Sequence, residues 1–191
     1  MSWLLDTDVI CQPANRHGDA RVVAWLEEEQ DRCYTSAVVI AQLAYWVRAK
    51  DGRRRQVLQA WLTRLVDALH GRIHGFNVSV AHVWADQEAL LDKAGQRMPV
   101  EDSYIAATAR RHGLTIATGN DRDFRRPGLR VFNPFAKTAS RKLTVTRRRP
   151  TRCRSFAMSC LERVSEKLWF VVNDMSCMKN GRVSVSLNWF V

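Results

Sequence analysis

The sequence contains no apolar run close to the roughly 20 residues that a helix needs to cross a bilayer. Its N-terminus, Met-Ser-Trp-Leu-Leu-Asp, also lacks the basic segment followed by an apolar segment that marks a signal peptide. From these two absences we expect a cytoplasmic protein that does not associate with a membrane.

Cysteine is scarce and irregularly spaced. The five cysteines form no CxxC pair and have no zinc-ligand spacing. An odd number spread along the chain is not a disulfide framework, so we expect free thiols in a reducing compartment. The cysteines are Cys11, Cys33, Cys153, Cys160 and Cys177.

Glycine-rich phosphate-binding loops are absent as well. The sequence has neither a GxGxxG motif nor a Walker motif. These absences argue against a nucleotide-binding Rossmann enzyme and against an NTPase. There is also no evident helix-turn-helix signature.

Positive charge is abundant but unevenly distributed. The net charge of the chain is +11, and residues 137–191 hold 12 of the 30 Lys and Arg but 3 of the 19 Asp and Glu. The net charge is therefore +9 in residues 137–191 and +2 in residues 1–136. We place a domain boundary near residue 136, and the high isoelectric point does not show that the first domain binds nucleic acid.

The apolar pattern of residues 1–136 predicts strands that alternate with helices, which indicates a parallel sheet. We expect strands at Trp3–Asp6, Cys33–Val38, Arg72–Val78, Leu114–Thr118 and Val131–Phe132. We expect helices at Ala20–Gln30, Val39–Arg48, Arg53–His70, Val80–Lys93 and Glu101–His112.

Acidic residues stand where these predicted strands end or helices begin. Asp6 closes the first strand, Asp102 lies in the first turn of a helix, and Asp121 and Asp123 follow the fourth strand. Parallel strand ends face a common crevice, and carboxylates gathered there suit magnesium or manganese. Each acid taken singly also fits an ordinary turn or helix start, but their joint placement favours a metal site.

Four segments together resemble the motifs of PIN domains. Leu-Leu-Asp-Thr-Asp-Val-Ile (4–10) is similar to the opening motif, in which Asn more often stands in place of Asp8. The second segment is Thr-Ser-Ala-Val-Val-Ile-Ala-Gln-Leu (35–43), and the third is Asp-Ser-Tyr-Ile-Ala-Ala-Thr-Ala (102–109). The fourth, Leu-Thr-Ile-Ala-Thr-Gly-Asn-Asp-Arg-Asp-Phe (114–124), is followed by Val-Phe-Asn-Pro-Phe (131–135). The nearest group is the VapC-type toxins of type II toxin–antitoxin pairs, including the FitB-like branch.

The resemblance implies a PIN-like three-layer α/β fold for residues 1–136, with a parallel five-stranded sheet in the order 3-2-1-4-5 flanked by helices. It also implies a ribonuclease that uses Mg²⁺ (or Mn²⁺) to cleave RNA, forms a homodimer and is held inactive by a cognate antitoxin. The matching positions nominate Asp6, Asp102 and Asp123 as the catalytic, metal-binding acids. Thr7, Gln42, Asn120 and Asp121 are expected to surround these acids without being the main metal ligands.

Two positions depart from the family pattern. Gln42 stands where a Glu is usual, so one negative charge and a two-oxygen ligand are lost. Trp46 stands where Gly is common, and its ring either crowds the site or packs as an ordinary apolar side chain. An active toxin and an impaired PIN-fold protein that binds antitoxin or RNA without turnover therefore both remain open.

Basic residues offer contacts for RNA. Arg125 and Arg126 directly follow the fourth motif and are the best candidates for binding phosphates, although a charge run is also a common solvated surface. Residues 137–191 form a basic C-terminal extension outside the resemblance. The extension either adds nucleic-acid binding or has no selected fold.

Overall fold

The structure of the protein is a computed structural model, and it describes residues 1–136. The expectations for residues 137–191 lie outside the described residues. Five strands form one parallel sheet in the order β3-β2-β1-β4-β5, which confirms the predicted fold. The strands are β1 (Trp3–Leu5), β2 (Cys33–Ser36), β3 (Ile73–His74), β4 (Thr115–Ala117) and β5 (Val131–Phe132).

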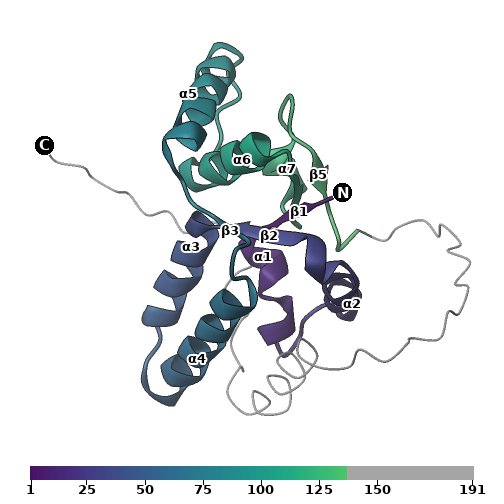
Figure 1. Cartoon of the computed structure of the whole chain (residues 1–191), viewed down its shortest axis with the longest axis vertical. Coiled ribbons are helices and arrows are strands. Elements are labelled where there is room, and N and C mark those ends of the chain that lie inside the picture. The colour runs from purple at the N-terminus through teal and green to yellow at the C-terminus, as the bar shows by residue number, and fades with distance from the viewer. Residues whose placement is uncertain (137–191) are drawn as a thin grey trace, which may run out of the picture.

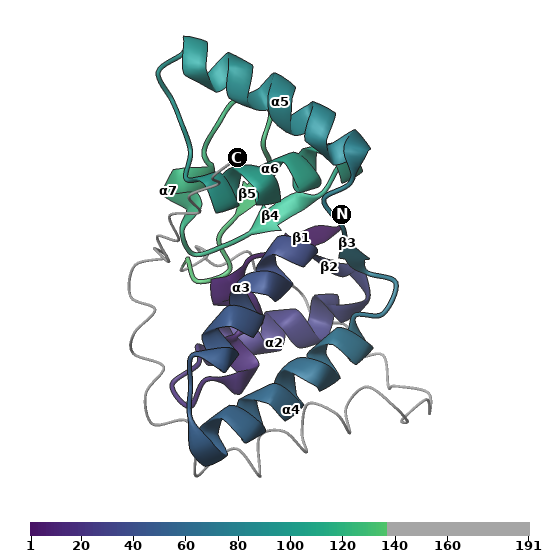
Figure 2. The same cartoon turned by 90° about the vertical axis from the view of Figure 1, so that its left-hand side faces the viewer.

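Helices cover both faces of this sheet and produce three layers. Figures 1 and 2 show α1 to α4 on one side and α5, α6 and α7 on the other. The helices are α1 (Thr7–Ile10), α2 (Ala20–Glu29), α3 (Ala37–Arg48), α4 (Gly52–Ala68), α5 (Val78–Lys93), α6 (Val100–His112) and α7 (Asp121–Phe124). Two 3-10 turns, η1 (Gln12–Ala14) and η2 (Gln30–Arg32), complete the described part.

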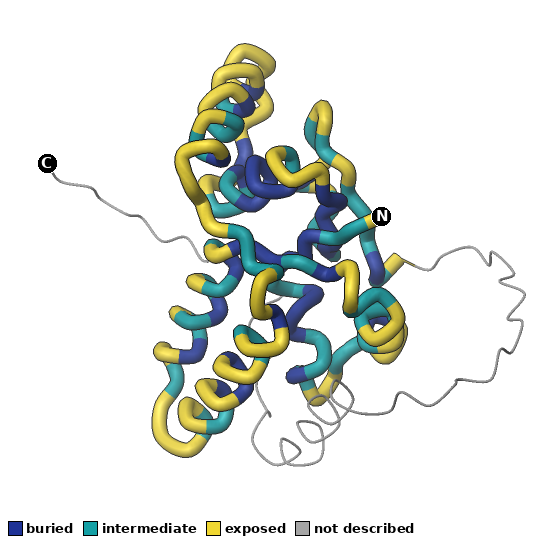
Figure 3. Tube along the Cα trace, in the orientation of Figure 1, coloured by how far each residue is buried: buried dark blue, intermediate teal, exposed yellow. Residues whose placement is uncertain are grey.

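The core lies between these layers, where the central strands are buried on both faces (Figure 3). Leu4 of β1 and Ile116 of β4 are pairing partners and are fully buried. Burial of one such side chain contributes about 1.5–3 kcal/mol to folding. Among residues 1–136, no helix is both long enough and apolar enough to span a membrane.

An aromatic cluster ties the first strand to the last one. The ring centres of Trp3 and Phe132 are 5.0 Å apart, and Trp25 of α2 lies 5.4 Å from each of them. Aromatic rings at such separations attract each other beyond simple burial. The cluster therefore fixes α2 against the half of the sheet that contains β1 and β5.

Some predicted element boundaries were wrong. The strand expected at Cys33–Val38 ends at Ser36, because the Ser36 hydroxyl accepts a hydrogen bond from the Val39 N–H at 3.2 Å and starts α3. The third strand has only two residues, Ile73–His74. The four-residue helices α1 and α7 were not predicted, since one turn is too short to show a helical period.

Candidate metal centre

Asp6 follows β1 and begins α1 as its N-cap. Its Oδ1 accepts a hydrogen bond from the Thr7 N–H at 2.7 Å, and its Oδ2 accepts one from the Thr118 hydroxyl at 2.9 Å. The residue is only 9% exposed. Burial raises the pKa of its carboxyl group, and the two hydrogen bonds partly oppose this shift. The carboxylate is thus held in one orientation, in a place where its charge is poorly solvated.

Asp102 lies in the first turn of α6, near the positive end of the helix dipole. Burial, together with the negative charges of Asp6, Asp123, Glu101 and Asp8, raises the pKa of its carboxyl group to about 7. A negative charge that lies close to a carboxyl group makes its ionisation less favourable and so raises its pKa. Asp6 and Asp123, from two other segments of the chain, therefore lie near enough to Asp102 for their charges to act on it.

Asp123 is oriented by the residue that precedes α7. The Asn120 side-chain amide donates a hydrogen bond to Asp123 Oδ2 at 2.7 Å, and the Asn120 N–H donates one to the Thr118 hydroxyl at 3.0 Å. Thr118 in turn contacts Asp6. Asn120 and Thr118 therefore form a chain of hydrogen bonds between two of the acids, a role that the sequence suggested for Asn120 but not for Thr118.

Thr7 and Gln42 meet beside Asp6. The Thr7 hydroxyl donates a hydrogen bond to Gln42 Oε1 at 2.5 Å, so α3 is tied to α1 next to the first acid. Trp46, one turn after Gln42, is partly buried and packs against the hydrophobic core. The Lys50 ammonium group lies 5.3 Å from the centre of its ring. These contacts favour the packing interpretation of Trp46.

Asp8 is a fourth acid in this region, and sequence reasoning missed it. Its Oδ2 accepts a hydrogen bond from the Gly119 N–H at 2.8 Å, whereas its Oδ1 is buried and has no partner among the described residues. Burial and the charge of Asp6 together raise the pKa of the Asp8 carboxyl group to about 7. The only available signal was its spacing of two residues from Asp6.

Close approach explains why residue 119 is a glycine. A Cβ atom there would lie 2.8 Å from Asp8 Oδ2 and 2.9 Å from the ring of Phe135. Both distances are shorter than van der Waals contact, so a larger side chain would push the loop after β4 away from Asp8. We refer to Asp6, Asp8, Asp102 and Asp123 together as the acidic centre.

The acidic centre fits a hard divalent cation. Its acids offer oxygen ligands only, neighbouring acids raise the pKa of Asp8 and of Asp102, and one buried oxygen of Asp8 lacks a partner among residues 1–136. As the side chains stand in residues 1–136, no group of three or more His, Cys, Asp or Glu residues is placed so that it could hold a metal ion. A divalent cation bound by these acids would polarise a phosphodiester and activate water.

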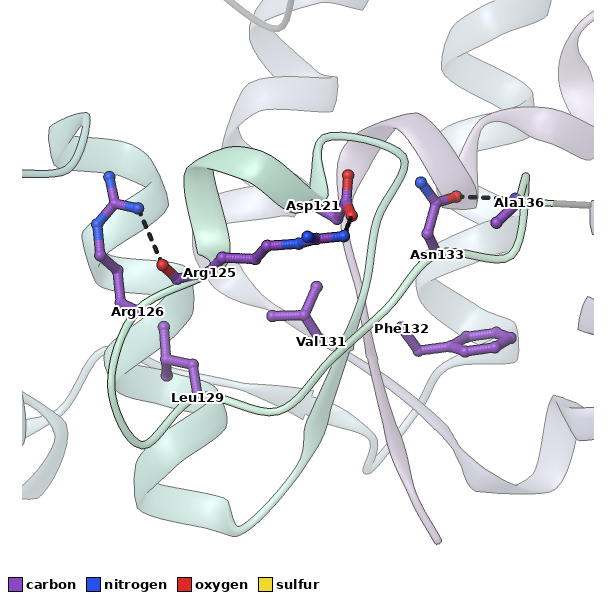
Figure 4. A pocket seen from close by; sticks show the side chains of 8 residues that line it. All are labelled: Asp121, Arg125, Arg126, Leu129, Val131, Phe132, Asn133 and Ala136. Atoms are coloured by element: carbon purple, nitrogen blue, oxygen red, sulfur yellow. Dashed lines mark hydrogen bonds and ion pairs between the residues drawn. The ribbon is translucent and has the colours of Figure 1, made fainter. Parts of the chain in front are cut away.

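Asp121, Arg125 and Arg126 lie beside the acidic centre and not in it. They line a neighbouring pocket of about 680 Å³, together with residues of β5 (Figure 4). Arg125 reaches across this pocket to form an ion pair with Asp121. Arg126 points the other way and donates hydrogen bonds to the carbonyl oxygens of Gln96 and Arg125, both at 3.1 Å.

Comparison with known proteins identifies the family. Residues 3–129 match the PIN domain, so the chain belongs to the PIN-domain family. It is 36% identical to the toxin FitB of Neisseria gonorrhoeae over 135 residues, which are 69% of this chain and 97% of FitB. It is also 33% identical to the VapC ribonuclease Y4jK of Sinorhizobium fredii, again over 69% of this chain and 96% of the relative.

Solved structures agree with this assignment. The structure of FitAcB from Neisseria gonorrhoeae superposes with a TM-score of 0.66 at 36% identity, over 69% of this chain and 97% of the other. FitAB bound to an IR36 DNA fragment gives a TM-score of 0.65 at 33% identity, over 69% and 94% of the two chains. The predicted family and sheet order are therefore confirmed.

Proposed function

We propose that this protein is the toxin of a toxin–antitoxin pair and acts as a metal-dependent endoribonuclease. The observation that carries this proposal is the acidic centre, in which carboxylates from three segments of the chain act on one another electrostatically. The names of the relatives, a toxin and a ribonuclease, support the same function. Because its RNA substrate is cytoplasmic, we place the protein in the cytoplasm.

Asp6, Asp102 and Asp123 are the proposed ligands of a Mg²⁺ or Mn²⁺ ion. Asp6 is fixed by two hydrogen bonds, Asp123 is fixed by Asn120, and Asp102 lies at the positive end of α6. Rigid ligands lower the cost of organising the metal site when substrate arrives. Thr7 and Gln42 support Asp6 from the side of α3.

The proposed substrate contacts come from the pocket beside the acidic centre. Arg125 is 74% exposed in its side chain, so it can exchange its ion pair with Asp121 for an RNA phosphate. The guanidinium group of Arg126 is already bound to backbone carbonyl groups, so we assign it the weaker contact. We propose that residues 137–191, with a net charge of +9, add affinity that does not depend on RNA sequence.

Two protein partners belong to this proposal. The solved relatives are named FitAB and FitAcB, which supports a cognate antitoxin as the first partner. A second copy of the chain is the other partner. The exposed apolar side chains Val78, Leu90 and Val100 of α5 and α6 are candidates for that contact.

The test is RNA cleavage by metal-free protein before and after magnesium is added. We expect cleavage only with magnesium, and we expect Asp102→Asn to reduce it greatly while the protein stays folded. Unchanged cleavage in EDTA would contradict the metal mechanism. Cleavage by the Asp102→Asn protein at the original rate would contradict the assignment of the acids.

Gln42 favours a second candidate function, in which the protein binds RNA or antitoxin without turnover. Its neutral side chain forms a hydrogen bond with Thr7 where an acid would add charge beside Asp6. This candidate predicts RNA binding in a gel-shift assay, with no cleavage at any magnesium concentration.

A further inference from the structure

Asp8 is the acid of this centre that has no assigned role. Its Oδ2 is held by the Gly119 N–H at 2.8 Å, and this bond directs the carboxylate toward the loop after β4. Its Oδ1 is buried with no hydrogen-bond partner among residues 1–136. A buried oxygen without a partner is costly, and a bound cation would remove that cost.

Asp8 shares its surroundings with the acids of the proposed metal site. The charge of Asp6 acts on Asp8, and the charge of Asp8 acts on Asp102. Asp8 therefore lies within the same electrostatic environment and is not an isolated turn residue. Its contact with Gly119 places it beside Thr118, the residue that binds Asp6.

Gln42 contacts the same short segment of chain from the other side. It accepts a hydrogen bond from Thr7, the residue between Asp6 and Asp8. A neutral side chain at position 42 thus contacts the residue between two acids, Asp6 and Asp8. These two departures from the pattern of PIN domains have opposite signs, so the total charge of the centre is preserved.

We propose that Asp8 supplies the negative charge that Gln42 does not, and that its free Oδ1 binds the divalent cation. This inference rests on the proposed metal-dependent function. Asp8 is then a metal-binding residue of this chain, and Gln42 serves to position Thr7. The competing view is that Asp8 only holds the Gly119 N–H in place.

Asp8→Asn separates the two views, because an Asn side chain keeps an oxygen for the Gly119 N–H but removes the charge. We would titrate Mn²⁺ and Mg²⁺ into metal-free full-length protein by calorimetry. We expect Asp8→Asn to weaken metal binding about 10- to 100-fold. Gln42→Glu added to Asp8→Asn should restore most of the affinity, since it returns one negative charge to the centre.

The matched control is Asp86→Asn, which removes an exposed acid of α5 far from any role in the site. Its metal affinity should equal that of the unchanged chain. Melting in EDTA should show Asp8→Asn to be at least as stable as the unchanged chain, because repulsion with Asp6 is removed.

Equal metal affinity of Asp8→Asn and the unchanged chain would overturn the inference. So would a loss of affinity that Gln42→Glu fails to restore, because a purely structural defect is not repaired by charge at another position. Asp102→Asn distinguishes this result from failure of the proposed function. If Asp102→Asn abolishes metal binding while Asp8→Asn does not, only the role of Asp8 is wrong; if both bind metal normally, the metal centre itself is wrong.

Discussion

The Thr118 hydroxyl donates a hydrogen bond to Asp6 Oδ2 at 2.9 Å and thereby joins the ends of β1 and β4. The Thr118 hydroxyl oxygen also accepts a hydrogen bond from the Asn120 N–H at 3.0 Å. Because that N–H occupies the acceptor side of the hydroxyl, its single proton is directed at Asp6. The orientation of the first acid therefore depends on the loop that also carries Asn120.

Thr118→Val tests this dependence with almost no change of shape. The buried Asp6 oxygen would lose its donor, and we expect a loss of about 1–3 kcal/mol in the free energy of unfolding. Thr118→Ser keeps the hydroxyl and is the matched control. Chemical denaturation of both variants measures the difference, and equal stability of the Val and Ser proteins would show that the hydrogen bond is not important.

Removal of the charge of Asp102 should reduce catalysis without damage to the fold. Asp102→Asn keeps the size of the side chain and relieves repulsion with Asp6 and Asp123. We expect cleavage to fall about 100-fold or more, while the melting temperature in EDTA stays equal or rises. A single-turnover cleavage assay and a melting curve on the same preparation test both parts. A fall in melting temperature would show that the carboxylate is needed for folding.

Gln42→Glu should change the magnesium requirement. A carboxylate at position 42 would add a negative charge beside Asp6, because Gln42 already contacts Thr7. We expect stronger cleavage at limiting magnesium, with an equal or lower melting temperature in EDTA because the acids repel one another. A magnesium titration of the cleavage rate is the measurement. An unchanged magnesium requirement would show that side chain 42 does not act on the metal.

Metal-free protein should lose stability as the pH rises. The pKa of Asp8 and of Asp102 is about 7 in the folded protein, against an ordinary value of 3.8, so the folded state binds more protons between these values. The stability they contribute is fully present below about pH 4 and is lost as the pH rises through about 7. Denaturation in EDTA across this range measures the slope, and magnesium should remove the loss at high pH.

Asp102→Asn is the control for this pH dependence, since it should flatten the slope. The stacked rings of His74 and His112, 3.7 Å apart, act in the opposite direction. Burial lowers the pKa of both groups below 6.5, so they cost stability as the pH falls below that value. The two histidines are present in both proteins, so the difference in pH dependence of stability between the Asp102→Asn protein and the unchanged chain reports on Asp102 alone. Identical slopes would contradict the pKa shift of Asp102.

A chain that ends at Ala136 should fold by itself. All five strands and the helices that cover them lie within residues 1–136. The net charge falls from +11 to +2, so non-specific RNA affinity should fall and its dependence on salt should weaken. Circular dichroism and RNA binding at several salt concentrations test both parts. An unfolded product would move the domain boundary past residue 136.

The fold could be predicted from the sequence because its longer helices and its alternation of strands with helices produce regular apolar patterns. Helices such as α4 and α5 show their period over 17 and 16 residues, and strands alternate with them in the order that a parallel sheet requires. The order of the strands came from the resemblance of the motifs. The single-turn helices α1 and α7 lack such a pattern, and β3 is too short, at two residues, to show one.

The residues of the candidate site were harder to predict from the sequence than the fold. Asp6, Asp102 and Asp123 occupy motif positions, and the charges of Asp6 and Asp123 act on Asp102 in the structure, but their assignment as metal ligands stays a prediction. Asp8 and Thr118 were missed because their significance depends on contacts with residues more than a hundred positions away. A local pattern presents Asp8 as a turn residue and Thr118 as the end of a strand. Only the pairing of β1 with β4 brings Asp8 to Gly119 and Thr118 to Asp6.

That pairing also determines when the site comes into existence. β1 is the first strand to leave the ribosome, yet it is the middle strand of the sheet, and its neighbour β4 is separated from it by almost the whole domain. Contacts between such distant segments form late, because a long loop must close first. During most of its synthesis, a nascent chain therefore contains Asp6 and Asp8 but not yet Thr118 and Gly119, which orient them. Under the proposed function, the chain cannot cleave RNA until translation of the domain is almost complete.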